Sequence, residues 1–118
     1  MARILVVDDD EGVRSFIAEA LETSGHQETE AGSGEEAMRS LQAHSYQLLI
    51  TDLRMPGQGG MVLLRQARSL WPELERIVLP AFGTVQSAVE AMKLGAFDVV
   101  QKPLPNPESL RLLVARAI

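Results

Sequence analysis

Short apolar blocks and amphipathic blocks alternate along the chain, and this pattern predicts strands and helices in turn. The apolar runs within 3–7 and 48–51 are typical of buried strands, whereas 11–24 carries apolar residues at helical spacing. Residues 27–31 show no apolar pattern, so we expect a weak strand at the edge of the sheet. Further strands are expected at 77–79 and 97–101. Four further helices are expected: one begins after Ser33, one follows the loop at 55–60 and ends at about Leu70, one covers 84–94, and one begins after Asn106.

Strict alternation of five strands and five helices predicts an α/β fold, with a doubly wound parallel sheet covered on both faces. Local signals support the helix starts: Ser33 and Glu36 have the spacing of a capping box, and Asn106 precedes Pro107. The 118 residues fit one domain, 1–118. The last apolar helical pattern reaches Ile118 without a capping residue, so we expect the natural protein to continue with a further domain.

Acidic residues follow two of the predicted strands directly. Ile4–Val7 runs into Asp8, Asp9 and Asp10, and Leu48–Thr51 runs into Asp52. The carboxyl ends of parallel strands share the sheet edge where ligands bind, so neighbouring strands would bring Asp8, Asp9 and Asp52 into one pocket. Such acids repel one another unless a cation neutralises them, and oxygen ligands with room for water and phosphate suit Mg²⁺. The sequence therefore predicts a Mg²⁺-dependent phosphate site.

Other interpretations of these residues are available. Acids favour a helix N-terminus, which explains Asp10 well but leaves Asp52 unexplained. Lys102 follows the strand expected at 97–101; an isolated lysine is normally a solvated charge, but at this edge it can reach an anion held by the acids.

Residues 32–37 match the G-x-G-x-x-A dinucleotide fingerprint, with Asp52 about twenty residues further on. The strand expected before them is polar, and Ser33 and Glu36 are explained by capping. We therefore interpret this segment as a helix start.

Composition excludes several other classes of protein. The net charge of −5 argues against binding of nucleic acid or an anionic membrane by this domain itself. The chain has no cysteine, and so neither a disulfide framework nor a thiolate zinc site. The apolar run after Arg3 is too short for an export signal, and no stretch reaches the length of a membrane span. A cytoplasmic location is the default expectation.

Three segments together resemble the receiver domain of bacterial two-component response regulators: Ile4–Asp10, Leu49–Gly57, and Gly95–Asp98 leading to Lys102–Pro103. The resemblance covers essentially the whole chain. Within the family, residues 81–95 look most like the nitrogen-regulator class. The resemblance implies a flavodoxin-like sheet of order 2-1-3-4-5 with five helices, followed in the full protein by an output domain.

Residue by residue, the resemblance implies a phosphoacceptor at Asp52. Asp8, Asp9 and Asp52 would hold Mg²⁺ together with the backbone carbonyl of Arg54, and Lys102 would contact the phosphoryl group. Such a domain is an acceptor rather than a turnover enzyme. The implied phosphoryl donor is a histidine kinase or a small acyl phosphate. The other implied partner is an output domain that regulates transcription. The receiver would control it through the face formed by the fourth helix, the fifth strand and the fifth helix. Homodimerisation on activation is an option that the resemblance leaves open.

The chain departs from the family at two switch positions. Pro80 stands where receivers usually carry Thr or Ser, and Val99 where they usually carry Tyr or Phe. Proline has neither a hydroxyl nor an N–H group to bind the phosphoryl oxygens. An alternative function is therefore a receiver uncoupled from phosphorylation, acting as a constitutive interaction module. An enzymatic alternative, a haloacid-dehalogenase-like phosphatase, needs a second Asp where this chain has Arg54.

Overall fold

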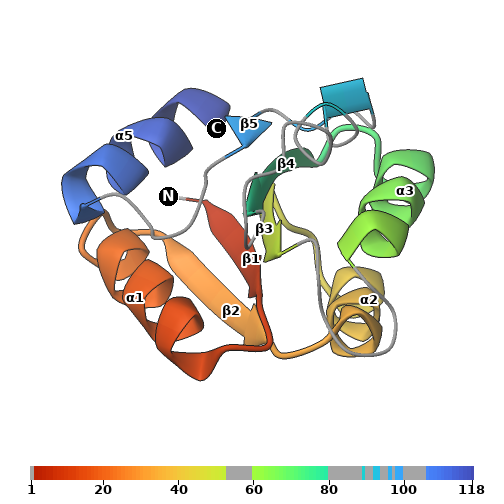
Figure 1. The fold of residues 1–118 in the computed structure, drawn as a ribbon, viewed down its shortest axis with the longest axis horizontal. Helices are drawn as coiled ribbons and strands as arrows, with labels where there is room; N and C mark the ends of the chain where they lie inside the picture. The colour runs from red at the N-terminus through yellow and green to blue at the C-terminus, as the bar shows by residue number, and fades with distance from the viewer. Residues whose placement is uncertain are drawn as a thin grey trace.

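The computed structural model describes residues 2–52, 60–79, 89, 92–93, 96, 98–99 and 106–118. Its centre is a five-stranded sheet of order β2-β1-β3-β4-β5, in which every neighbouring pair is parallel (Figure 1). The strands are β1 (Arg3–Val7), β2 (Gln27–Ala31), β3 (Leu48–Asp52), β4 (Glu75–Leu79) and β5 (Asp98–Val99). The helices are α1 (Glu11–Glu22), α2 (Gly34–Ala43), α3 (Gly60–Leu70) and α5 (Pro107–Ala117).

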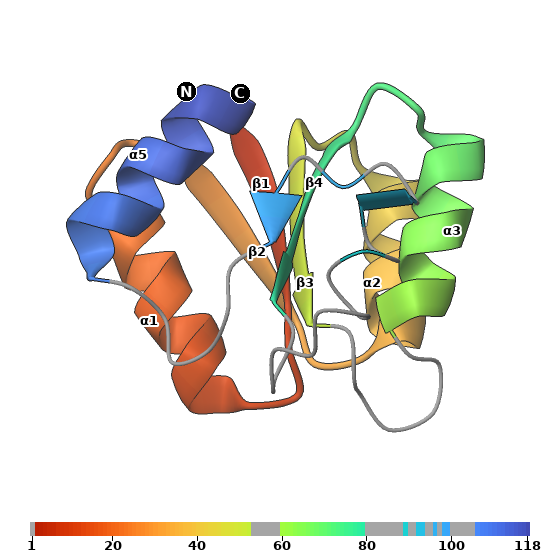
Figure 2. The ribbon, with the colours of Figure 1, turned by 45° about the horizontal axis from the view of Figure 1, so that its top comes forward.

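Helices cover both faces of the sheet: α1 and α5 lie on one side, and α2 and α3 on the other (Figure 2). Alternate residues of β1 serve the two faces. Ile4 and Val6 pack in a core with α1 and α5, whereas Leu5 and Val7 pack in a second core with α2 and α3. A strand buried on both faces has no polar side, which explains the continuous apolar runs. The predicted α/β class and parallel sheet are confirmed.

β2 and β4 show how far the apolar pattern predicts the strands of the sheet. β2 pairs only with β1 among the described strands and is mostly exposed, so the expected edge strand is confirmed. β4 begins at Glu75, two residues before the expected strand, and its second residue, Arg76, is charged but only 7% exposed. Burial lowers the pKa of Arg76, and the neighbouring carboxylate of Glu75 acts in the opposite direction.

The expected helix over 84–94 lies mostly outside the described residues; positions 89, 92 and 93 are helical. The number of five helices therefore stays a prediction. In the described ranges, no helix has the length and apolar character needed to cross a bilayer.

Polar side chains cap the N-termini of α2 and α5, and a glycine follows the C-terminus of α1. Ser33 accepts a hydrogen bond from the Glu36 N–H at 3.2 Å, as expected of a capping residue. The Glu36 carboxylate, however, accepts from the N–H of Gly32 at 3.2 Å, one residue before the position that the capping-box pattern predicts. Gly25, after the end of α1, has φ of 80°, a conformation that favours glycine. Asn106 caps α5 by accepting from the Ser109 N–H at 2.8 Å.

Two residues show where side-chain type alone misjudges a helix face. Phe16 belongs to the apolar pattern of 11–24, yet it is 36% exposed, and the buried residues of α1 are Ile17, Ala18, Ala20 and Leu21. Arg111 of α5 is charged, as on a solvated helix face, yet it donates from Nε to the carbonyl oxygen of Ala20 at 2.9 Å. Its Nη2 also donates to Thr23 Oγ1 at 3.4 Å, so Arg111 ties α5 to the last turn of α1.

Candidate metal centre

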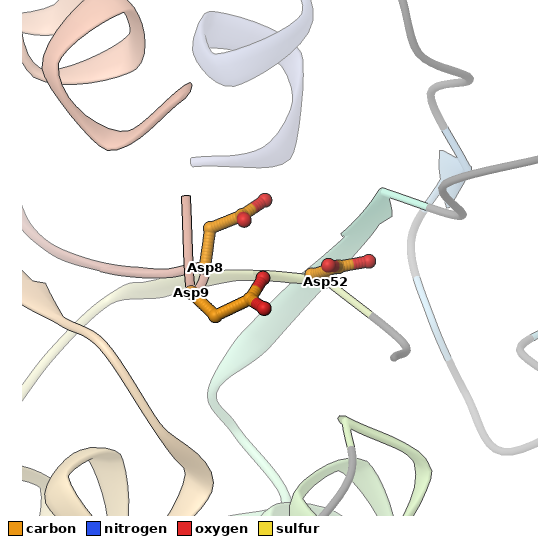
Figure 3. Close-up of side chains that lie close together, drawn as sticks. All are labelled: Asp8, Asp9 and Asp52. Atoms are coloured by element: carbon orange, nitrogen blue, oxygen red, sulfur yellow. The ribbon is translucent and has the colours of Figure 1, made fainter. Parts of the chain in front are cut away.

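Three carboxylates meet at the carboxyl edge of the sheet. β1 and β3 are neighbours, and Val7 lies opposite Thr51 in their register, so the residues that follow stand side by side. One carboxylate oxygen from each of Asp8, Asp9 and Asp52 lies within 4.8 Å of the others. Figure 3 shows the three side chains together at the ends of these two strands. The proximity expected from their places after two apolar strands is thus observed.

The three acids differ in their exposure to solvent. Asp8 is fully buried and Asp52 is 2% exposed, whereas Asp9 is exposed. Buried carboxylates are costly unless opposite charge or hydrogen bonds compensate them. Here the two buried carboxylates, Asp8 and Asp52, lie close together, and the exposed Asp9 lies beside them. The arrangement suits a cation that reaches the acids from the solvent.

The main chain after β1 holds Asp8 and separates Asp10 from the cluster. The Asp8 N–H donates to the carbonyl oxygen of Ala31 at 3.2 Å, and Asp8 Oδ1 accepts from the Asp10 N–H at 2.9 Å. Asp10 Oδ1 accepts from the N–H groups of Gly12 at 2.8 Å and Val13 at 3.3 Å. Asp10 is therefore the N-cap of α1, and its interpretation as a helix start is confirmed.

Arg14 is a residue of this site that the sequence did not reveal. Its Nη1 donates to the carbonyl oxygen of Asp8 at 2.7 Å, and its Nε donates to Glu30 Oε1 at 3.3 Å. One signal was available. Arg14 lies four residues after Asp10, and long side chains on a helix lean toward its N-terminus. A cation one turn into α1 therefore leans back toward the end of β1.

Asp52 ends β3 beside a buried threonine. The Thr51 hydroxyl donates to the carbonyl oxygen of Asp52 at 3.0 Å, and Asp52 lies opposite Leu79 of β4. Val99 lies in β5, opposite Val78 of β4. The side chain of Val99 falls outside the described part of the structure.

Three of the predicted site residues, Arg54, Pro80 and Lys102, lie outside the described residues. The roles that the resemblance gives them stay predictions. Residues 32–37 contain the N-cap and the first turn of α2, as the helix-start interpretation predicts. Asp52, which the dinucleotide fingerprint would use, lies in the acidic cluster.

The donor set of the cluster fits Mg²⁺. All three side chains offer oxygen, which hard divalent cations prefer over softer metals. Three carboxylates are few enough to leave coordination positions for water and for a phosphoryl oxygen. Asp8, Asp9 and Asp52 are therefore the described residues that can hold the ion.

Comparison with known proteins gives one consistent family. Residues 4–115 match the family described as response regulator receiver domain. The response regulator protein FleR of Pseudomonas aeruginosa is 35% identical over 117 residues, covering 99% of this chain and 25% of FleR. The DNA-binding transcriptional regulator NtrC of Escherichia coli is 36% identical over 115 residues, covering 98% of this chain and 24% of NtrC. This chain thus spans about a quarter of the length of these relatives.

Solved structures agree with these relatives. NtrX from Brucella abortus superposes with a TM-score of 0.92 at 30% identity, covering 98% of this chain and 26% of NtrX. A response regulator receiver protein from Pseudomonas putida gives a TM-score of 0.89 at 34% identity, covering 97% of this chain and 95% of that protein.

Proposed function

This chain belongs to the response regulator receiver domain family, and we propose that it accepts a phosphoryl group on Asp52 in a two-component phosphorelay. The observation that carries the proposal is the meeting of Asp8, Asp9 and Asp52 at one sheet edge. Among these acids, Asp52 ends the central strand β3 and is nearly buried, so its position is set by the sheet itself. A nucleophile fixed in this way is oriented before its substrate arrives.

The proposed reaction is an in-line displacement at phosphorus. An oxygen of the Asp52 carboxylate forms a bond to the phosphorus of a phosphohistidine on a kinase. The phosphorus–nitrogen bond breaks, and its electron pair stays on the imidazole nitrogen. With an acyl phosphate as donor, the bond to the acyl oxygen breaks instead and the carboxylate of the acid leaves.

Asp8 and Asp9 have a different role from Asp52 in this proposal. Together with Asp52 and the backbone carbonyl of Arg54 they hold Mg²⁺, and Lys102 contacts the phosphoryl group, as the family resemblance implies. The chemistry that Mg²⁺ would supply there is neutralisation of negative charge on the acids and on the phosphoryl oxygens. The protein's own contribution is to fix the acids and to bring the donor into line with Asp52.

The wider role follows from the relatives. NtrC is named as a DNA-binding transcriptional regulator, and about three quarters of it lies beyond the region that this chain matches. We propose that the chain regulates an attached output domain in the same way, through the face formed by the fourth helix, β5 and α5. A histidine kinase as partner and a cytoplasmic location are part of the same proposal.

The intact acidic cluster is the reason for preferring an active acceptor over a constitutive interaction module. The alternative, a constitutive interaction module, is suggested by Pro80 and Val99. Neither residue belongs to the acidic cluster, so these two replacements leave the three carboxylates in place. Three carboxylates in a small space repel one another, and a bound cation would offset that repulsion, which favours a domain that binds Mg²⁺.

The test is phosphorylation of the purified chain by acetyl phosphate, followed by intact-mass measurement. With Mg²⁺ the protein should gain one phosphoryl mass, and chelation of the metal should prevent the gain. Asp52→Asn should abolish it. Asp10→Asn is the matched control, because it removes the same charge from the α1 cap without touching the cluster, and it should be labelled normally. Full labelling of Asp52→Asn would overturn the assignment of the acceptor.

A further inference from the structure

We infer that Arg14 is a positioning residue for the metal centre, which sets Mg²⁺ affinity by fixing the peptide that joins Asp8 to Asp9. This inference rests on the proposed function, because it takes the acidic cluster to be a Mg²⁺ site. Arg14 does not belong to the cluster. Its contact is with the main chain from which two of the three acids project.

The main chain is held on both sides of the Asp8 Cα atom. Before it, the N–H of the Val7–Asp8 peptide donates to the carbonyl oxygen of Ala31 on β2 at 3.2 Å. After it, the carbonyl of the Asp8–Asp9 peptide accepts from Arg14 Nη1 at 2.7 Å. Because a peptide unit is planar, fixing that carbonyl also fixes the direction in which the chain enters Asp9. Asp9 is the exposed acid of the three, so the main chain rather than surrounding packing determines where its carboxylate lies.

Arg14 is itself anchored, which a positioning residue requires. Its Nε donates to Glu30 Oε1 of β2 at 3.3 Å, and only 19% of its side chain is exposed. Gly32 lies beside it: a Cβ at that position would stand 3.5 Å from Arg14 Nη1, in contact with the guanidinium. The guanidinium thus joins α1, the end of β1 and the end of β2. Its planar fork donates in two directions at once, which the single ammonium of lysine does not reproduce.

Charge and geometry make opposite predictions for this residue. A guanidinium close to the cluster repels an incoming cation, so by charge alone its removal should strengthen Mg²⁺ binding. If Arg14 acts by holding the Asp8 carbonyl, its removal should weaken Mg²⁺ binding, because the position of Asp9 is no longer fixed. The sign of the change in affinity separates the two effects.

The test is the Mg²⁺ dissociation constant of the chain, measured by isothermal titration calorimetry without phosphate. Loss of a group that orients a metal ligand typically weakens affinity by about 10- to 100-fold, and we expect about tenfold for Arg14→Gln. Arg14→Lys keeps the charge but replaces the guanidinium fork by a single ammonium group, which can make one of the two contacts, so its affinity should fall between Arg14→Gln and the wild type. Arg39→Gln removes the same charge from an exposed position on α2 and should change the affinity less than about twofold.

A spectroscopic signature accompanies the loss of affinity. The backbone amide resonance of Asp9 should shift in metal-free Arg14→Gln and stay in place in Arg39→Gln, which a general loss of stability would not produce. Unchanged or stronger Mg²⁺ binding by Arg14→Gln would overturn the inference while leaving the proposed function intact. If Arg14→Gln does not fold, Arg14→Lys decides: weaker binding supports the inference and unchanged binding overturns it. A wild-type chain that binds no Mg²⁺ would overturn this inference and the proposed function together.

Discussion

Replacing Asp9 by Asn should change the stability of the protein in opposite directions with and without Mg²⁺. Asparagine has nearly the shape of aspartate, so the substitution removes a charge while changing little else. In the metal-free protein that charge stands close to two buried carboxylates, Asp8 and Asp52. With Mg²⁺ bound, the same charge is a ligand.

The size of the metal-free effect follows from the geometry. With charges within 4.8 Å of each other, one repulsive pair costs about 0.9 kcal/mol at the dielectric constant of water, which suits an exposed residue such as Asp9. Physiological salt reduces this roughly by half. Since Asp9 faces two partners, Asp9→Asn should raise the free energy of unfolding by about 1 kcal/mol, or the melting temperature by roughly 4 °C.

Mg²⁺ should reverse the order of the two proteins. An ion that binds only the folded state stabilises it by about 2.7 kcal/mol at one hundred times its dissociation constant. Asp9→Asn loses one of the three carboxylates and should lose most of this gain. At saturating Mg²⁺ the wild type should therefore be more stable than Asp9→Asn by about 1–2 kcal/mol.

Urea unfolding, with and without Mg²⁺ at matched ionic strength, measures both differences. Asp10→Asn is the control, since it removes the same charge one residue further along, and asparagine caps a helix about as well as aspartate. That variant should keep the full Mg²⁺ response. The reasoning is refuted if metal-free Asp9→Asn is less stable than the wild type, or if Mg²⁺ stabilises Asp9→Asn as much as the wild type.

The remaining predictions concern the frame around the site, and urea unfolding measures each of them. Asp10→Ala should lower the free energy of unfolding by about 1 kcal/mol, because α1 loses its cap, whereas Asp10→Asn should not. Tyr46→Phe should lower the free energy of unfolding by about 1 kcal/mol, because the 2.6 Å hydrogen bond between the Tyr46 and Ser40 hydroxyls is lost. It should leave the Mg²⁺ affinity unchanged, because Tyr46 precedes β3 and so lies at the opposite edge of the sheet from the acidic cluster. Gly25→Ala should cost about 1 kcal/mol, because its φ of 80° strains any residue with a Cβ; no loss would show that the turn adapts.

The strands show what an apolar pattern can predict. β1 and β3 are buried on both faces along their apolar runs, Ile4–Val7 and Leu48–Ile50, so the positions of these two strands could be predicted. The first two residues of β4, Glu75 and Arg76, could not be predicted in this way, because they are charged. Arg76 is 7% exposed and lies opposite Leu49 of β3, a pairing between strands that no local sequence pattern encodes.

The acidic cluster could be predicted because it depends only on topology. Asp8 follows β1 and Asp52 ends β3, so knowing that β1 and β3 are parallel neighbours is enough to bring Asp8 and Asp52 together. The contacts of Arg14 and Arg111 could not be predicted, because each joins a side chain to a backbone carbonyl of another element. Backbone carbonyls carry no residue identity, so sequence patterns do not mark them as partners.

Asp9 and Asp10 mark the limit of prediction from sequence most sharply. They are adjacent and identical, yet the structure gives Asp9 to the cluster and Asp10 to the first N–H groups of α1. The division depends on where the helix starts, since only the residue at the N-cap can accept from Gly12 and Val13. The comparison of Asp9→Asn with Asp10→Asn tests this division directly. Equal loss of the Mg²⁺ response in both variants would mean that the ion responds to the total charge of the turn after β1, and not to a ligand fixed by the fold.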